Sequence, residues 1–274
     1  MKIIIFILLF NTTCFSQENS VFWKIEKDNN HSYVLGTNHI FGKTFIEKDA
    51  TIFDALKKSE IILTENTGTK DSIINARLES KTNELFTTNE MNIIKNIVDN
   101  NIDYHKLKLK EIFIFSENFW NKISCLNHKE QNELITIDDF VKNFALKEKK
   151  IIIGLEKIST TIETVDSLPF EGNDDNKLLH RVKYRLSAID KRLKHQECVM
   201  TDLYRNKKFS FNFDMTLNLY YIAGRNKKWF QTITNALKSK KTTFIAVGIA
   251  HLDYKNGLIA MLRKQGYTVT PIDL

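Results

Sequence analysis

Apolar and polar positions along this chain predict short strands that alternate with longer helical stretches. Apolar residues recur every three or four positions at 47–60, through 70–147 and 158–238, and again at 257–266. Strand-like runs lie at 61–65, 149–156, 242–251 and 267–272, and residues 20–39 have the pattern of a hairpin around the polar turn KDNNH. The alternation predicts an α/β fold with a central, mostly parallel sheet, an added N-terminal β-hairpin and a large helical middle or cap region.

Four of the apolar runs end on an ionisable residue, which is His39, Glu65, Glu156 or His251. Ligands of open α/β sheets bind beyond the carboxyl ends of the strands, so we expect these side chains at one edge if the strands are parallel neighbours. Both histidines follow a glycine by three positions, Gly36 and Gly248, which makes two GxxH segments. Because glycine has no Cβ, it permits a bend or a close backbone approach before each histidine.

Two imidazoles and two carboxylates would suit a divalent metal ion such as Mn, Co or Zn. A catalytic metal would keep one position for water and lower the pKa of that water. Without a metal, histidine and glutamate would act as general base and general acid on a bound water. A structural interpretation stands beside both, because a polar residue after a strand often caps the next helix. The residues alone leave these alternatives open.

Two further polar residues are candidates that also have an ordinary structural explanation. Arg225 precedes Trp229 by four residues on an expected helix, where it would hold a substrate carboxylate or carbonyl, or simply lie in solvent. Asp138 would support the site or act as a helix N-cap.

The N-terminus predicts export. One lysine precedes eight apolar residues, Ile3 to Phe10, and small polar residues follow. This pattern is typical of a signal peptide at 1–17 and is too short to span a bilayer. A lipid anchor at Cys14 is less favoured, because Thr13 suits a lipoprotein signal poorly. We expect a periplasmic or extracellular protein with one domain at 18–274, a helical insert at about 70–147 and no transmembrane span after signal removal.

Charge and cysteine content narrow the expected function. The net charge is +7, but the basic residues form short clusters near expected helix ends and lack the interleaved aromatic residues of a nucleic-acid groove. Nucleic-acid binding is therefore not expected. Cys125 and Cys198 remain after signal removal. They would pair in an oxidising compartment or stay as buried thiols, and the sequence leaves both open.

Several segments together resemble the TraB/GumN family: YVLGTNHI, KKIIIGLE, VDSLP, GRNKKW and the C-terminal block from FIAVGIAH to VTPI. The resemblance extends over about residues 20–274. The family includes TIKI-like metalloproteases, and its fold is similar to that of the erythromycin-esterase-like and ChaN-like group. This resemblance implies a hydrolase that uses two GxxH motifs with divalent cations, although the same scaffold also implies ester hydrolysis or haem binding.

The resemblance also implies roles for individual residues of this chain. The implied metal ligands are His39, His251, Glu65 and Glu156, and the implied catalytic residues are Glu65, Glu156 and Arg225. Asn38, Asp138 and Asn226 are candidates for contacting the substrate or supporting these residues. We expect a secreted metal-dependent hydrolase, a peptidase acting on a peptide or protein. The alternatives are a metal-independent esterase-type hydrolase and a haem- or metal-binding protein without turnover.

Overall fold

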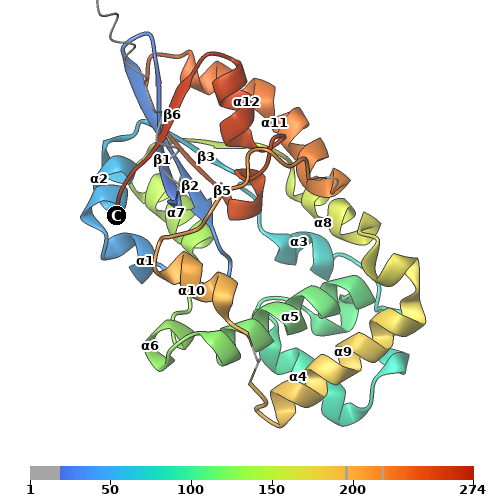
Figure 1. Cartoon of the computed structure of the whole chain (residues 1–274). Helices are drawn as coiled ribbons and strands as arrows, with labels where there is room; N and C mark the ends of the chain where they lie inside the picture. The colour runs from blue at the N-terminus through green and yellow to red at the C-terminus, as the bar shows by residue number, and fades with distance from the viewer. Residues whose placement is uncertain (1–18, 195–196, 218) are drawn as a thin grey trace, which may run out of the picture.

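The computed structural model describes residues 19–194, 197–217 and 219–274. Within these residues, six strands form one sheet in the order β4-β3-β5-β2-β1-β6 (Figure 1). The strands are β1 (Phe22–Lys27), β2 (Asn30–Thr37), β3 (Ile61–Thr64), β4 (Ile151–Gly154), β5 (Thr243–Gly248) and β6 (Thr268–Pro271). The four strands from β4 to β2 are parallel, whereas β1 pairs antiparallel with β2 and β6. The predicted α/β fold with a hairpin added to a mostly parallel sheet is confirmed. The predicted signal peptide lies outside the described residues.

The hairpin turn forms at the polar segment that the sequence indicates. Asp28 and Asn29 connect β1 to β2, and their φ angles are 52° and 62°. Both angles lie in the left-handed region, which aspartate and asparagine tolerate better than most residues. Their short polar side chains therefore allow a tight connection between the strands.

Two strands end before the histidines that the sequence pattern assigns to them. β2 ends at Thr37, two residues before His39, and β5 ends at Gly248, three residues before His251. Residues Ile249–His251 form a 3₁₀ turn, η4. The Gly248 N–H donates to the Glu65 carboxylate at 2.8 Å instead of to a strand. The apolar residues after Gly248 thus continue a buried turn, which hydrophobicity alone does not distinguish from a strand.

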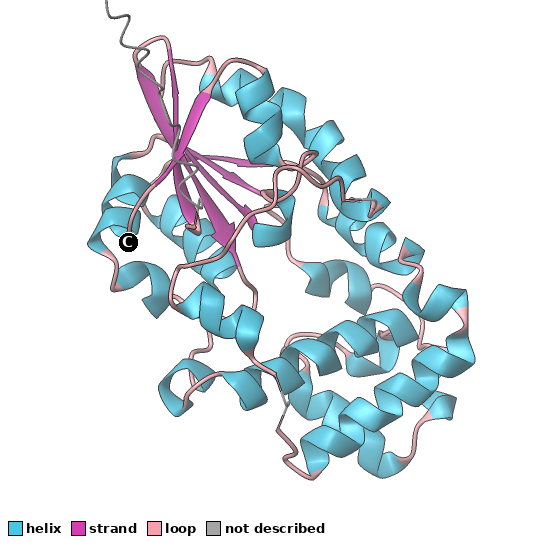
Figure 2. Cartoon of the chain, viewed as in Figure 1, coloured by secondary structure: helices cyan, strands magenta, loops and turns pink. Residues whose placement is uncertain are grey.

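Helices cover both faces of the sheet and form a further layer (Figure 2). The helices are α1 (Thr44–Glu47), α2 (Ala50–Lys58), α3 (Lys70–Asn75), α4 (Thr88–Ile97), α5 (Leu109–Cys125), α6 (His128–Gln131), α7 (Ile137–Lys147), α8 (Ile158–Ser167), α9 (Asp175–Asp190), α10 (Val199–Arg205), α11 (Tyr220–Leu237) and α12 (Leu258–Lys264). One face of the sheet packs on α11 and α12, and the other packs on α1, α2, α7 and α10. Each face therefore has its own apolar core.

A third core lies among the helices beyond the carboxyl ends of the parallel strands (Figure 1). It joins α4, α5 and α9, with Ile94, Ile112, Val182 and Leu186 fully buried. A disulfide between Cys125 and Cys198 connects the end of α5 to the start of α10. The structure therefore resolves the alternative that the sequence left open for these two cysteines.

The described helices include none that combines the length and the apolar character required to cross a membrane.

Candidate functional site

Three of the residues that follow the parallel strands converge on one arginine. Glu65 follows β3, Glu156 lies two residues after β4, and His251 ends the turn after β5. Arg225 reaches this edge from α11. Its Nη2 donates to Glu65 Oε2 at 2.6 Å and to Glu156 Oε1 at 2.8 Å, and its Nε donates to Glu156 Oε2 at 3.1 Å. Its Nη1 lies 3.2 Å from His251 Nε2.

The Arg225 side chain is more buried than the lysines beside it in the sequence indicate. The Arg225 side chain is only 13% exposed, so it does not form the solvated helix face that its lysine neighbours allowed. Burial opposes its charge, but Glu65 and Glu156 outweigh burial and raise the pKa of Arg225. A buried guanidinium bound to two carboxylates is a permanent positive centre for the cluster.

Trp229 forms one wall of this cluster. Its indole N–H donates to Glu156 Oε2 at 3.0 Å, and the Arg225 guanidinium lies 4.5 Å from the ring centroid. The ring of His251 packs against the same indole with 4.4 Å between centroids. A single buried side chain thus contacts three of the converging residues.

His251 is a buried imidazole with a defined partner for each nitrogen. Its Nδ1 lies 2.7 Å from Asn226 Oδ1, and Asn226 Nδ2 donates to the His251 carbonyl at 3.1 Å. Burial is the main reason why the pKa of His251 falls to about 4, and the nearby Arg225 charge adds to that effect. The ring is therefore neutral near pH 7, with Nδ1–H donating to Asn226 and Nε2 accepting from Arg225.

Glu65 is the carboxylate that connects this cluster to the outer part of the edge. Burial opposes its ionisation, but the charges of His251, Arg225 and His39 lower the pKa of Glu65. Because His251 is neutral near pH 7, Arg225 is the partner that acts there most directly. The Gly248 N–H also donates to Oε1. Glu65 is therefore an ionised carboxylate with fixed orientation.

His39 forms a separate pair with Asp138. His39 Nδ1 lies 2.8 Å from Asp138 Oδ2, and the Thr37 hydroxyl donates to Asp138 Oδ1 at 2.8 Å. The charge of Asp138 raises the pKa of His39 to about 9. The side chain of His39 is 59% exposed. The pair therefore gives a protonated imidazole that solvent reaches, with Nε2 not engaged by Asp138.

A cavity of about 60 Å³ lies between the His39–Asp138 pair and Glu65, which belongs to the Arg225 cluster. It is lined by His39, Thr64, Glu65, Asn66, Asp138 and Lys142. This volume is sufficient for water, and its lining offers the polar partners that a bound water requires. The cavity places an imidazolium and an ionised carboxylate around the same small space.

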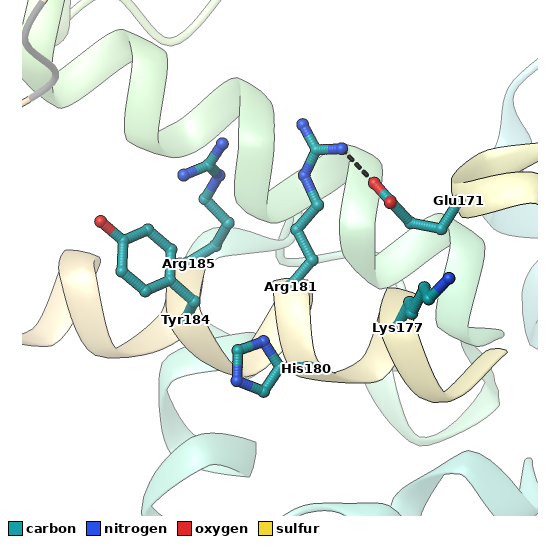
Figure 3. Close-up of a pocket in the computed structure, with 6 residues that line it drawn as sticks. All are labelled: Glu171, Lys177, His180, Arg181, Tyr184 and Arg185. Carbon is teal, nitrogen blue, oxygen red and sulfur yellow. Dashed lines mark hydrogen bonds and ion pairs between the residues drawn. The ribbon is translucent and has the colours of Figure 1, made fainter. Parts of the chain in front are cut away.

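A larger hollow of about 460 Å³ lies on α9, away from these residues (Figure 3). It is lined by Glu171, Lys177, His180, Arg181, Tyr184 and Arg185. Its cations already have carboxylate partners, since Arg181 pairs with Glu171, Arg185 with Glu117 and Lys177 with Asp174. We therefore interpret this hollow as an ion-paired helix surface and place the candidate site at the smaller cavity.

The remaining sequence candidates lie at or near the same edge. Asn226 supports His251, as described, and Asp138 orients His39. Asn38 instead accepts from the N–H of Ile40 at 3.3 Å, which is a local turn contact. Two further residues at this edge were not predicted from the sequence, Lys142 and Thr161. Lys142 lines the cavity, and the Thr161 hydroxyl donates to Glu156 Oε1 at 2.7 Å. No motif marks either residue, although Lys142 follows Asp138 by one helical turn.

Both GxxH glycines lie where an added Cβ would have a close neighbour. A Cβ on Gly36 would lie 2.9 Å from Ile249 Cγ1, and Ile249 belongs to the second GxxH segment. A Cβ on Gly248 would lie 3.2 Å from Glu65 Oε1. Gly36 therefore packs against the second motif, whereas Gly248 packs against Glu65.

The donor set does not fit a divalent metal in this arrangement. Metal ligands must direct lone pairs at the ion, whereas Arg225 directs N–H groups at Glu65, Glu156 and His251. In the part of the chain that the structure describes, no three His, Cys, Asp or Glu side chains form a group that could hold a metal ion. The expected Mn, Co or Zn ion stays a prediction.

A family model, described as the TraB/PrgY/gumN family, matches residues 21–271. The chain belongs to the TraB/PrgY/gumN family. No curated protein and no solved structure matches it significantly. The match covers every strand of the sheet and every residue of the Arg225 cluster, so the site described above is part of the TraB/PrgY/gumN-matched region. The closer likeness to TIKI metalloproteases and to the ChaN-like group stays a prediction.

Proposed function

We propose that this member of the TraB/PrgY/gumN family is a hydrolase of acyl bonds, in which His39 is the general acid and Glu65 the general base. The observation that carries the proposal is the shared cavity lined by both side chains. Their pKa values shift in opposite directions, upward for His39 and downward for Glu65. Titratable groups whose environments separate their pKa values are typical acid and base pairs.

The proposed reaction consumes one water and balances within the site. Glu65 removes a proton from water as the water oxygen attacks the acyl carbon of an ester or peptide. When the tetrahedral intermediate collapses, the bond to the leaving oxygen or nitrogen breaks, and His39 Nε2 gives its proton to that atom. Exchange with solvent then deprotonates Glu65 and reprotonates His39. General acid and base steps of this kind each contribute roughly 10²–10⁴ in rate.

The Arg225 cluster has a positioning role in this proposal. Arg225 keeps Glu65 ionised and oriented through their 2.6 Å contact. Asp138 does the equivalent for His39, since it holds Nδ1 and leaves Nε2 for the substrate. Preorganised groups of this kind avoid reorganisation during the reaction.

The earlier expectation of a peptidase remains part of the proposal, and so does export. A peptide or protein is the expected substrate, with an ester as the alternative. The disulfide between Cys125 and Cys198 supports a periplasmic or extracellular location, because disulfides persist in oxidising compartments.

The test uses residues 18–274, a mixed peptide library and a panel of aryl esters, with products identified by mass spectrometry. We expect His39→Asn and Glu65→Gln each to lower kcat by about 100-fold or more. His31→Asn is the matched control, because His31 is an exposed histidine near the start of β2, the strand that precedes His39. It should retain full activity.

Added Mn²⁺ or Co²⁺ and a chelator complete the design. Turnover that a chelator leaves intact supports the mechanism above. Turnover that a chelator abolishes and metal restores would replace it with the metal-dependent hydrolase. Binding of haem or metal without any turnover would contradict a hydrolase altogether.

A further inference from the structure

We propose that Lys142 makes this site selective for substrates that carry a carboxylate next to the bond that is cleaved. The inference rests on the proposed function, because it names the substrate class of the same cavity. It begins from the one charged lining residue that neither the sequence motifs nor the acid–base pair uses. That residue is Lys142.

The helix α7 brings Lys142 to the cavity. Asp138 and Lys142 are four residues apart in α7 (Ile137–Lys147), so their side chains lie on one face of the helix. Both line the cavity together with His39 and Glu65. The lysine therefore belongs to the wall that orients His39.

The ammonium group of Lys142 is positioned and still has donors to offer. Its Nζ lies 2.9 Å from Asp139 Oδ1, and the lysine side chain is 20% exposed. An ammonium has three N–H donors, and one contact with Asp139 leaves two of them for a ligand. The contact with Asp139 and the partial burial restrict the stem before any ligand arrives, which lowers the entropy lost on binding.

The other cations near this edge are committed elsewhere. Arg225 donates to Glu65 and Glu156. Lys70 acts on His39 through its charge, but it pairs with Asp99 at 3.7 Å and does not line the cavity. His39 is the proposed proton donor to the leaving group. A substrate anion that enters this cavity therefore meets Lys142 as its available partner.

A carboxylate is the anion that fits the position of Lys142. The carboxylates of Glu65 and Asp138 line the same small cavity, so an anion there needs the lysine ammonium to offset their repulsion. In a peptide, a carboxylate near the cleaved bond has two sources. It belongs either to the free C-terminus or to an acidic side chain, and both present the same group to an ammonium.

Binding tests this inference separately from turnover. The probes are acetyl-Ala-Ala with a free or an amidated C-terminus, and the amides of acetyl-Asp and acetyl-Asn. In at least one of the two pairs, we expect the protein to bind the carboxylate probe about 10- to 100-fold more tightly than the neutral probe. The first pair reports a C-terminal carboxylate, and the second pair reports an acidic side chain.

Lys142→Met keeps an unbranched apolar stem and removes the charge. It should abolish the preference for the carboxylate probe, whereas Lys147→Met, an exposed lysine in the last turn of the same helix, should retain it. Equal affinity of the unchanged protein for both members of both pairs would refute the inference. So would a preference that survives in Lys142→Met.

With a cleaved substrate in hand, kinetics separate binding from catalysis. Lys142→Met should raise KM by about 10- to 100-fold for carboxylate substrates and leave kcat unchanged. A fall in kcat for charged and neutral substrates alike would instead make Lys142 a catalytic group and overturn the selectivity. If neither substrate is cleaved, the proposed function fails, while the binding result still decides the role of Lys142.

Discussion

At the scale of single residues, two histidines in similar motifs have opposite environments. His251 is buried and packs on Trp229, whereas His39 is exposed and pairs with Asp138. Burial disfavours a charged imidazole, and a neighbouring carboxylate favours it. The GxxH pattern is therefore shared by two residues with different protonation states near pH 7. This difference depends on tertiary neighbours that are distant in the sequence.

His39 leads to a pH-dependent prediction. Its pKa of about 9 is above the reference value of 6.5, so the stabilisation from its charged pair with Asp138 is complete below about pH 6.5 and is lost as pH rises through about 9. Solvent screening keeps this contribution to stability small, because His39 is largely exposed. We expect nuclear magnetic resonance to show the imidazole titrating near pH 9 in the unchanged protein.

Two neighbouring carboxylates provide the comparison. Asp138→Asn should move the pKa of His39 toward 6.5, and activity should then fall at a lower pH than before. Asp139→Asn should leave the titration nearly unchanged, because Asp139 pairs with Lys142. Equal shifts in both variants would show that general surface charge, not the Asp138 contact, sets this pKa.

Trp229 provides a second prediction at this scale. Trp229→Phe removes the indole N–H that donates to Glu156 and keeps an aromatic ring beside His251. Loss of a buried hydrogen bond to a charged acceptor should lower the free energy of unfolding by about 1–3 kcal/mol. Urea unfolding measures this change.

The same prediction has a kinetic part, which compares Trp229 with a tryptophan distant from the Arg225 cluster. Activity should fall in Trp229→Phe and remain in Trp120→Phe, a second buried tryptophan in the helical layer whose indole donates to the Leu193 carbonyl. If both variants lost the same activity, the wall formed by Trp229 would have no special role.

At the scale of elements, the sequence predicts the sheet better than it predicts the turns. Period-two and apolar runs locate all six strands, and Asp28 and Asn29 locate the hairpin turn. The residues after Gly248 are apolar in either conformation, so the pattern does not indicate where β5 ends. Arg225 has lysine neighbours along α11, but its hydrogen-bond partners include Glu65 and Glu156, which follow β3 and β4 and are distant in the sequence.

The packed GxxH segments give a prediction for these elements. Gly36→Ala would force a Cβ to 3.1 Å from the Ile249 backbone, and overpacking of this kind should destabilise the protein by about 1–3 kcal/mol. Gly248→Ala would press on Glu65 Oε1 and should lower activity more than stability.

Thermal or urea unfolding, measured beside kcat, separates the two effects. Gly172→Ala is the control, because a Cβ there meets no atom within 4 Å and its only strain is a φ of 68°. It should lose some stability and no activity. Normal activity in Gly248→Ala would contradict close packing of Glu65 on the second motif.

At the scale of the whole molecule, the disulfide links the helical layer to the sheet. From Cys198, α10 extends to Tyr204, whose hydroxyl donates to the Gly36 carbonyl at 2.8 Å. The connection runs from the end of α5 to the first GxxH segment. The sequence contains both cysteines but no information on their distance, since 73 positions separate them.

Removal of this bond should lower global stability. The Cys125→Ser, Cys198→Ser double variant should have a free energy of unfolding about 2–5 kcal/mol lower in urea. Without the cross-link, the unfolded chain has more conformational entropy. Reductant should shift the unchanged protein toward the same value and leave the double variant unaffected. Equal stability with and without reductant in the unchanged protein would contradict this prediction.

The order of the strands has a consequence for synthesis of the chain. β5 lies between β3 and β2, so residues 243–248 are the piece that joins the β1–β2 hairpin to the β3–β4 pair. A nascent chain that stops near residue 240 holds two unconnected fragments of sheet, each with an unpaired edge. Assembly of the site is thus delayed until residues 243–248 have been made, and a premature stop codon before residue 243 leaves no partial activity.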